Sequence, residues 1–156
     1  MKKTLFIVGL LFATAISINA QDISKNAIGL RLGDNDGFGG EISYQRALTG
    51  NNRLEVDLGI RNDNDYDGFK ATGIYQWVWK IEGDFNWFAG VGGGVGSFSY
   101  NAGGSDTFAF VAGDIGIEYN FDAPIMLSLD YRPEFGFSNT YDGINSDIAL
   151  SIRYQF

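Results

Sequence analysis

The residues whose spacing best suits chemistry form an acidic segment, 63–68, which reads Asp-Asn-Asp-Tyr-Asp-Gly. Oxygen ligands at alternate positions, followed by a glycine, match the opening of a calcium-binding loop. The position that requires a bidentate Glu in that motif holds Ile74, so the motif is incomplete. We therefore expect a solvated acidic loop, and weak Ca²⁺ binding by Asp63, Asp65 and Asp67 is a hypothesis.

The residue types of the chain exclude most enzyme chemistry. The chain has no His and no Cys, which removes the usual general base near neutral pH, thiolate metal sites and disulfides. The glycine-rich run 90–96 has neither the dinucleotide fingerprint nor a Gly-Lys-Ser/Thr ending. Paired carboxylates such as Glu55 and Asp57 are expected to point inward beside arginines, which favours ion pairing over glycosidase chemistry. The chain is therefore predicted to be a non-enzyme with no cofactor and no resident metal.

Composition points to strands. The 156 residues carry 11 Lys and Arg against 19 Asp and Glu, an acidic balance that argues against a nucleic-acid partner. The chain has 22 Gly, 13 Phe and 8 Tyr but only 2 Pro. This combination predicts many strands and tight turns in one domain rather than helices or disorder.

The first twenty residues are typical of a secretory signal peptide. Lys2 and Lys3 precede an apolar run over residues 5–16, and Ala20 offers a small residue at the cleavage position. The run is too short for a comfortable membrane helix. We therefore divide the chain into a cleaved signal peptide, 1–20, and a mature domain, 21–156, in which any membrane role must come from strands.

Apolar and polar residues alternate with period two along the mature domain, which predicts eight antiparallel strands. The alternating segments are 28–32, 41–45, 53–60, 74–81, 85–100, 114–121, 125–132 and 147–156. Tight turns are expected at 49–52, 82–84 and 122–124. Longer loops are expected at 62–68, 101–106 and 138–145, and the first loop, 34–37, is expected to be short. Short turns at one end and long loops at the other are typical of an up-and-down transmembrane β-barrel.

The composition of the polar positions predicts that they face the interior of the barrel. They combine Gly, Ala and Ser with charges of both signs and very little Lys, as a narrow eight-stranded lumen requires. The predicted interior polar network comprises Arg31, Glu41, Glu55, Asp57, Asp114, Glu118, Asp130, Arg132 and Arg153.

Aromatic residues on the apolar face cluster near the short turns and the chain end, which predicts a girdle at a membrane–water boundary. Its predicted members are Tyr44, Trp77, Trp79, Phe85, Trp87, Tyr119, Phe121, Tyr154 and Phe156.

A few residues interrupt the regular alternation. Arg46 lies on the apolar face and is expected to extend to the headgroups. Pro133 is expected to mark a bulge or a strand portion above the bilayer. An apparent switch of face at Phe98, Tyr100, Phe108 and Phe110 is compatible with a bulge or with an extension clear of lipid.

With its signal peptide, eight strands, girdle and terminal residues 151–156, the chain resembles the OmpX-like and OmpA-barrel family of small bacterial outer-membrane proteins. The resemblance covers essentially all of the mature domain. It implies that Ile152, Tyr154 and Phe156 form the signal read by the barrel-assembly machinery. It also implies location in the outer membrane, contact with its lipids and a monomeric barrel that presents loops to an extracellular partner. The loops look shorter than those of adhesive relatives.

Three functions remain open at this stage. The first is a structural or surface-interaction protein with a salt-bridged, largely plugged interior. The second is a narrow pore for ions or small solutes, because the glycine-rich fifth strand could leave a water path. A weaker third possibility is a secreted soluble lipocalin-like barrel, which requires an apolar lumen.

Overall fold

A computed structural model describes residues 23–33, 39–62, 66–100, 103–139 and 141–156. These residues form eight strands and no helix. The strands are β1 (Asn26–Leu32), β2 (Gly40–Thr49), β3 (Asn52–Asn62), β4 (Tyr66–Glu82), β5 (Phe85–Tyr100), β6 (Ser105–Asn120), β7 (Ile125–Ser138) and β8 (Tyr141–Gln155). No helix in this part of the chain is long and apolar enough to cross a membrane.

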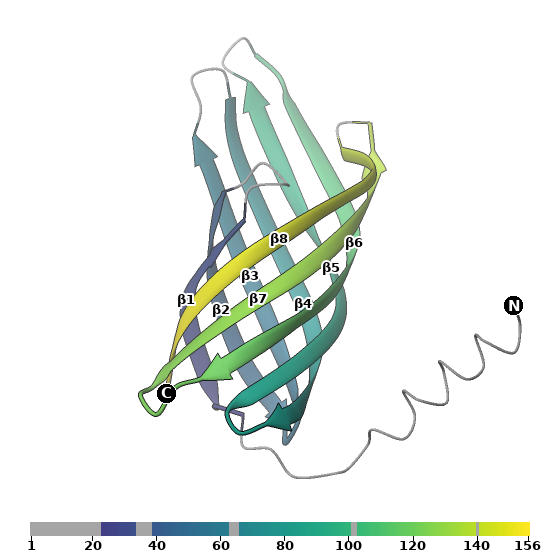
Figure 1. The fold of residues 1–156 in the computed structure, drawn as a ribbon. Coiled ribbons are helices and arrows are strands. Elements are labelled where there is room, and N and C mark those ends of the chain that lie inside the picture. Colours follow the sequence, from purple (N-terminus) through teal and green to yellow (C-terminus); the bar gives the residue numbers. More distant parts are fainter. Residues whose placement is uncertain (1–22, 34–38, 63–65, 101–102, 140) are drawn as a thin grey trace, which may run out of the picture.

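The strands close into an up-and-down antiparallel barrel in which each strand pairs with its neighbours in sequence (Figure 1). β1 and β8 close the ring, from the pair Ala27–Gln155 to the pair Leu32–Leu150. The backbone of Asn26 also exchanges hydrogen bonds with Phe156, at 3.0 and 2.9 Å. The ends of the barrel sequence therefore meet at one end of the barrel. The prediction of eight strands in a closed up-and-down barrel is confirmed.

The connections between strands differ in length from those predicted. The three tight turns lie where expected, at the end of the barrel where β1 begins and β8 ends, which we name the turn end. At the opposite end, the loop end, the expected long loops are short, because β4, β6 and β8 begin at Tyr66, Ser105 and Tyr141. The longest connection joins β1 to β2, where a short loop was expected. Strand pairing continues past the apolar alternation, since a ladder needs backbone partners rather than a hydrophobic face.

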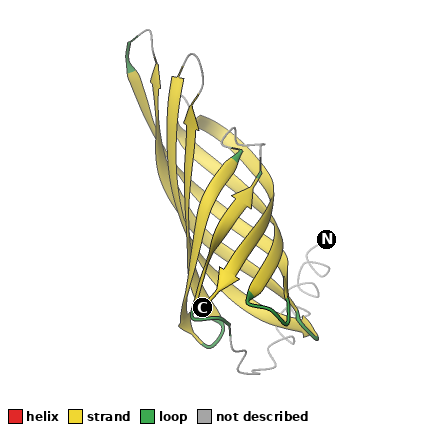
Figure 2. Cartoon of the chain, turned by 90° about the vertical axis from the view of Figure 1, so that its left-hand side faces the viewer, coloured by secondary structure: helices red, strands yellow, loops and turns green. Residues whose placement is uncertain are grey.

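The wall of the barrel is therefore uneven in height. β4, β5 and β6 contain 17, 16 and 16 residues, whereas β1 contains 7. A tilted strand of 16 residues spans about 40 Å, well above the apolar band of about 25 Å expected for such barrels. Figures 1 and 2 show these strands rising above the rest of the ring at the loop end.

The alternation of side chains is the reverse of that in a soluble barrel. Ile28, Leu30 and Leu32 on β1 are about half exposed, whereas Arg31 between them is 1% exposed. The same pattern of apolar outward and polar inward residues holds around the ring. The lipocalin-like alternative is wrong, because the lumen is polar and charged rather than apolar.

Neither of the two expected irregularities shifts the register of a ladder. β7 runs through Pro133, which pairs with Ser146 of β8, whereas pairing with β6 is interrupted between Ala112–Glu134 and Ile115–Tyr131 and resumes in the same register. The proline ring lies over Gly113, where an added Cβ would come within 3.4 Å of the ring. A proline is tolerated without a bulge because a glycine opposite leaves it room.

The apparent switch of face near the loop end is also not a bulge. β5 and β6 keep one register from Phe85–Tyr119 to Ser99–Ser105. Phe108 and Phe110 therefore stay on the inward side, where both are 3% exposed. The lumen itself changes from polar to aromatic at this height.

Candidate functional site: the lipid-facing wall and the filled lumen

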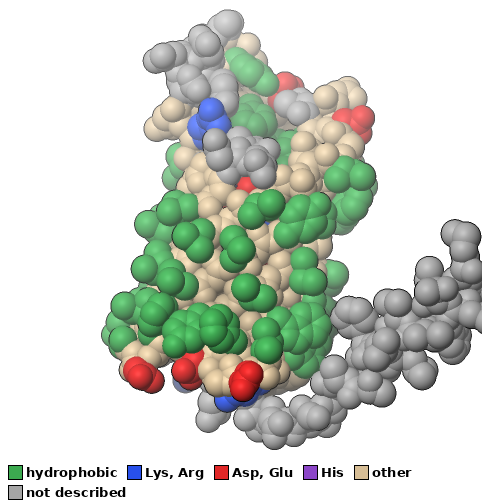
Figure 3. Space-filling model, in the orientation of Figure 1, with side chains coloured by type: hydrophobic (Ala, Val, Ile, Leu, Met, Phe, Trp, Pro, Cys, Tyr) green, Lys and Arg blue, Asp and Glu red, His purple; other side chains and the backbone are tan. Residues whose placement is uncertain are grey.

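The outer wall carries a continuous coat of aliphatic side chains. Exposed outward Ile, Leu and Val residues lie on all eight strands, at fractions between 38% and 71%. Figure 3 shows apolar side chains distributed over the visible wall, with acidic side chains gathered at its lower rim. A contiguous apolar surface of this extent is stable only against another apolar phase.

All the aromatic residues predicted to form the girdle lie on the outward face or at the chain end near the turn end. Trp79 of β4 and Trp87 of β5 stack with ring centroids 4.3 Å apart. The Tyr44 hydroxyl donates to the Asn26 side chain at 2.8 Å, and the Arg46 guanidinium donates to the same oxygen at 3.1 Å. Apolar rings with polar tips anchored at one level are the arrangement found at membrane–water boundaries.

A second group of outward aromatic residues lies near the loop end and was missed by the sequence analysis. Its members Phe69, Tyr131, Phe135 and Phe137 are exposed at fractions of 42–70%. Phe135 is ten residues along β7 from Ile125, a height of about 25 Å for a strand tilted by about 40°. The two aromatic levels are therefore separated by the thickness of a bilayer's apolar band. The sequence analysis ended the corresponding strands at the limits of hydrophobic alternation, 74–81 and 125–132. Phe69, Phe135 and Phe137 lie beyond these limits, so this second level was not recognised.

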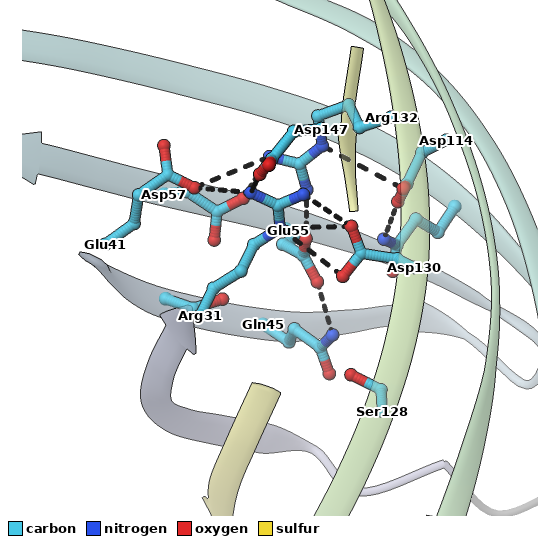
Figure 4. A network of polar contacts seen from close by, with 12 residues as sticks. Arg31, Glu41, Gln45, Glu55, Asp57, Asp114, Ser128, Asp130, Arg132 and Asp147 are labelled. Carbon is cyan, nitrogen blue, oxygen red and sulfur yellow. Dashed lines mark hydrogen bonds and ion pairs between the residues drawn. The ribbon is translucent and has the colours of Figure 1, made fainter. Parts of the chain in front are cut away.

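The middle of the lumen contains a charged cluster, the central network, that is built around three arginines (Figure 4). Arg31 on β1 contacts three carboxylates, with its guanidinium 2.8 Å from Glu41, 2.5 Å from Asp130 and 2.7 Å from Asp147. These carboxylates come from β2, β7 and β8, so one side chain joins four strands. Short charge-assisted hydrogen bonds of this kind fix the arginine geometry.

Arg132 and Arg153 complete the central network. Arg132 on β7 crosses the lumen to β3, where its guanidinium lies 2.7 Å from Glu55 and 2.8 Å from Asp57. Arg153 on β8 contacts the other Glu55 oxygen at 3.0 Å and donates to Ser43 and Ser128. Removing one member would leave a buried charge without its partner, which is costly.

The interior residues named from sequence are all at most 5% exposed, and most of them belong to the central network. Glu118 lies outside it, nearer the turn end, and is paired with Arg53 at 2.7 Å. Asp114 lies at the edge of the network, where it accepts a hydrogen bond from the Gln76 amide at 2.6 Å and lies 3.9 Å from Arg132 Nε. Further buried polar side chains were not identified as interior residues, and these include Gln45, Arg53, Lys70, Gln76, Asn86, Glu134 and Asp147. Their alternation with outward residues was the signal available for most of them.

The lumen near the loop end is filled differently, by what we name the loop-end layer: Lys70, Phe108, Phe110, Glu134 and Tyr141. Phe108 stacks on Tyr141 with ring centroids 4.7 Å apart. The Lys70 ammonium lies 2.8 Å from Glu134 and 5.1 Å from the centre of the Phe110 ring. The Tyr141 hydroxyl donates to Glu134 at 2.5 Å. The layer therefore packs aromatic rings around one ion pair.

Glycines on β5 make room for these rings. Gly94 lies opposite Phe110 and Gly96 lies opposite Phe108 across the β5–β6 ladder. A Cβ at Gly94 would come within 2.5 Å of the Phe110 ring, and one at Gly96 would collide with Phe108. Two glycines of the run 90–96, Gly94 and Gly96, therefore form a packing surface for inward rings.

A cavity of about 560 Å³ opens at the turn end of the lumen. Its deeper wall includes the Arg53–Glu118 pair and Asn86, whose side chain donates to Glu118 at 3.0 Å. Lys80 and Asp84 lie at its mouth. Beyond the cavity, the side chains of Arg132, Lys70 and Glu134 are 0% exposed.

The calcium hypothesis falls mostly outside the described residues. Asp63 and Asp65 are not described, whereas Asp67 is part of β4, where it pairs with Asn62 and Ser99. Asp67 therefore lies on an extended strand rather than in the expected loop. Within the described ranges, no group of three acidic side chains is placed to hold a metal ion.

Solved structures of small outer-membrane barrels share this fold. The chain is similar to Neisserial surface protein A, with a TM-score of 0.61 at 14% identity over 84% of this chain and 94% of that one. It is similar to the N-terminal β-barrel domain of Pseudomonas aeruginosa OprF, with a TM-score of 0.64 at 13% identity over 86% and 100%. Ail of Yersinia pestis gives 0.58 at 18% identity over 85% and 97%.

Comparisons by sequence add no relative. No family model matches the chain, and no curated protein matches it. The likeness to solved structures establishes the eight-stranded transmembrane barrel fold predicted from the sequence.

Proposed function

We propose that the mature chain is an integral outer-membrane protein with a structural or surface-interaction role rather than a transport or enzymatic one. The observation that supports this most directly is the distribution of burial. Thirteen Arg, Lys, Asp and Glu side chains are buried in the lumen, while the aliphatic residues of the wall are exposed. Such a molecule is stable only with its wall in lipid and its charges enclosed.

The proposal includes export and assembly. Residues 1–20 would direct export and be removed, and Ile152, Tyr154 and Phe156 would be read by the barrel-assembly machinery. These three side chains are 48–60% exposed on the outward face of β8 and its end. By analogy with other barrels of this kind, the turn end would face the periplasm and the taller wall of β4–β6 would project from the cell.

Fractionation of cells that express the full chain tests this proposal. The expected result is a chain beginning at Gln21 in the outer-membrane fraction, released only by detergent. A mature chain that stays monodisperse in buffer without detergent would contradict it. Protease treatment of intact cells is expected to cut connections at the loop end, and cleavage only after lysis would contradict the proposed surface exposure.

A narrow pore is the second candidate function, and the turn-end cavity is the observation that favours it. The central network and the loop-end layer oppose it, because each fills the section of the lumen with buried side chains. Recordings of the detergent-purified chain in a planar lipid film separate the two functions. A silent film is expected for the structural role, and reproducible conductance steps would indicate the pore.

An enzymatic role has little support. The buried carboxylates contact guanidinium, ammonium or amide groups, and the chain has no His to act as a general base. We propose that these carboxylates hold the barrel together and take no part in a reaction.

A further inference from the structure

β6 and β7 separate near the loop end. Their ladder runs up to the pair Phe110–Gly136 and stops there. β6 nevertheless continues through residues 105–109, which stay paired with β5, and β7 stays paired with β8 as far as Ser138. In Figure 1 the tip of the β7–β8 hairpin stands apart from the taller β5–β6 pair. Among the described residues, 105–109 therefore have a strand partner on one side only, and we name their other side the β6 edge.

The β6 edge carries backbone hydrogen-bonding groups. The ladder between β6 and β7 is interrupted where Gly113 faces Pro133, which has no N–H, whereas the ladder between Pro133 and β8 is continuous. Gly113 therefore directs its own N–H and C=O toward β7. Backbone groups of alternate residues on a strand point to the same side, so those of Ser105, Thr107 and Ala109 also point to the β6 edge. These groups can pair with an added strand.

An apolar groove of about 510 Å³ lies beside the β6 edge on the outer face of the barrel. Its lining residues come from four successive strands, with Phe69 of β4 at one end and Phe137 of β7 at the other. The Phe137 side chain is 70% exposed. Val95, Thr107 and Ala109 lie between the two rings. A strand added at the β6 edge would therefore have an apolar surface to cover with its outward side chains.

The β6 edge rises above the part of the wall that lipid covers. Phe135 of β7 lies at the upper aromatic level, and the next residue, Gly136, is paired with Phe110 of β6. Ser105 is five residues beyond Phe110, about 13 Å higher for a strand tilted by about 40°. Free backbone groups are tolerated at that height because water can solvate them. A lipid acyl chain cannot form a ladder, so a polypeptide is the occupant that uses both the edge and the groove.

The exposed charges on the strands around the β6 edge are acidic. Asp106 belongs to the edge and lies on the same side of β6 as Phe108. Asp142 of β8 is paired with Phe137, and Asp67 lies at the loop end of β4. All three carboxylates are exposed. A second copy of this chain would bring the same acids to the edge, whereas a basic segment would be attracted to it.

We propose that the β6 edge and the groove bind an extended basic segment of another polypeptide, which adds to β6 as a further strand. The proposal rests on the surface-interaction role proposed above and names the kind of partner. Alternate side chains of a strand face opposite sides. Apolar residues on one side of the added strand would cover the groove near Phe137, and Lys or Arg residues on the other side would approach Asp106. Backbone pairing supplies the affinity, and the alternation of side chains supplies the selectivity.

The test uses the mature chain folded in nanodiscs of zwitterionic lipid and a fluorescent eight-residue peptide of alternating Val and Lys. We expect saturable binding, measured by fluorescence anisotropy, and no binding of a peptide of alternating Val and Glu. A Val–Lys peptide with an N-methyl group on every residue keeps its charges and side chains but has no N–H to donate. It should bind at least about tenfold more weakly. Equal binding of the methylated peptide, or equal binding of the Val–Lys peptide to empty nanodiscs, would overturn the proposal.

Variants of the protein locate the binding at the β6 edge. Thr107→Pro removes an N–H that points to the edge and none that pairs with β5, so the affinity for the Val–Lys peptide should fall about tenfold. Thr107→Val retains the N–H and is the matched control, which should bind like the wild type. Phe137→Ala removes one end of the groove at an exposed position and should weaken binding about fivefold. Unchanged affinity in both Thr107→Pro and Phe137→Ala, or an equal loss in Thr107→Val, would overturn the proposal.

Two further measurements separate this proposal from its alternatives. A dimer of the detergent-purified chain that the Val–Lys peptide dissociates would identify a second copy as the occupant and overturn the choice of a basic partner. Failure of peptide binding leaves the proposed function intact, because fractionation of cells and protease treatment of intact cells test that function without the peptide.

Discussion

The central network and the loop-end layer occupy the same lumen but fill it by different physical means. In the central network, the single side chain of Arg31 contacts carboxylates from three other strands. In the loop-end layer, two phenylalanines and a tyrosine fill the section around a single Lys70–Glu134 pair. The first region fixes the relative positions of strands by charge, and the second fixes them by shape.

The comparison shows that a narrow barrel must match a large inward side chain with a small one on the next strand. Gly96 lies opposite Phe108 in the loop-end layer, and Gly29 lies opposite Arg153 in the central network. A Cβ at Gly96 would collide with the Phe108 ring, and one at Gly29 would collide with backbone atoms of Ile152 and Arg153. The chemistry of the large residue differs between the two regions, whereas the geometric requirement is shared.

The largest effect is expected from a break in the central network. Arg31→Leu would remove the guanidinium that lies within 2.8 Å of three buried carboxylates, Glu41, Asp130 and Asp147. We expect a loss of about 4 kcal/mol in the free energy of unfolding, measured by urea titration in lipid vesicles. Arg46→Leu, at an exposed position, is the control and should change it by less than about 0.5 kcal/mol. Equal losses for the two variants would show that charge pairing in the lumen contributes nothing.

Arg153→Leu should have a smaller effect in the same network. Its guanidinium holds one Glu55 oxygen at 3.0 Å, while Arg132 still holds the other at 2.7 Å. We expect a loss of about 3 kcal/mol in the free energy of unfolding, because the Glu55 carboxylate keeps its contact with Arg132. The same urea titration measures it, and an unchanged midpoint would contradict the prediction.

A break in the loop-end layer should cost a similar or slightly smaller amount by a different mechanism. Phe108→Ala removes a ring that is 3% exposed and stacked on Tyr141. The resulting cavity is expected to lower the free energy of unfolding by about 3 kcal/mol without stranding a charge. Its effect should be insensitive to salt and pH, and a strong dependence on either would show that the two regions are electrostatically coupled. Phe108→Leu, which retains most of the volume, is the control.

The requirement for a small residue can be tested by adding one methyl group. Gly96→Ala would bring a Cβ against Phe108 and within 2.6 Å of the Phe69 carbonyl oxygen. We expect a loss of about 2 kcal/mol from this overpacking. Gly73→Ala on the neighbouring strand is the matched control, because a Cβ there meets nothing within 4 Å. A result in which both variants retain full stability would contradict the packing account.

The smallest effect is expected outside the lumen, at the acidic segment that contains Asp67. If this segment binds Ca²⁺ weakly, calcium at its dissociation constant stabilises the barrel by only about 0.4 kcal/mol. Thermal melts in millimolar Ca²⁺ and in chelator measure the difference, with Asp67→Asn as the control that should reduce it. Identical melts would dispose of the calcium hypothesis.

Residues that alternate in one register could be assigned from the sequence with most certainty. Leu30, Arg31 and Leu32 show why: neighbouring side chains on a strand face opposite sides, so the pattern itself states which residues share a face. The hydrophobic pattern predicted the ends of strands such as β4 and β6 in the wrong places. Asp67, Ser99 and Ser105 continue the ladder as exposed polar residues, and exposed polar residues leave no hydrophobic period to detect.

The pairing of charges could not be obtained in the same way. Arg132 and Glu55 are 77 residues apart, and their contact depends on which strands face one another across the closed ring. Arginine and carboxylate compositions predicted that such pairs would form, but not which residues would form them. The longer contact of 3.9 Å between Asp114 and Arg132 was equally invisible, because it depends on the same arrangement of strands.

Sequence alone determined which side chains share each face of the barrel wall. A period of two in polarity places alternate residues on opposite faces of a strand, independently of how the strands pair. The height of the wall, the loop-end layer and the partner of each buried charge were decided only by the tertiary structure. Those features depend on ring closure and stagger, which bring residues from distant strands to one level of the lumen.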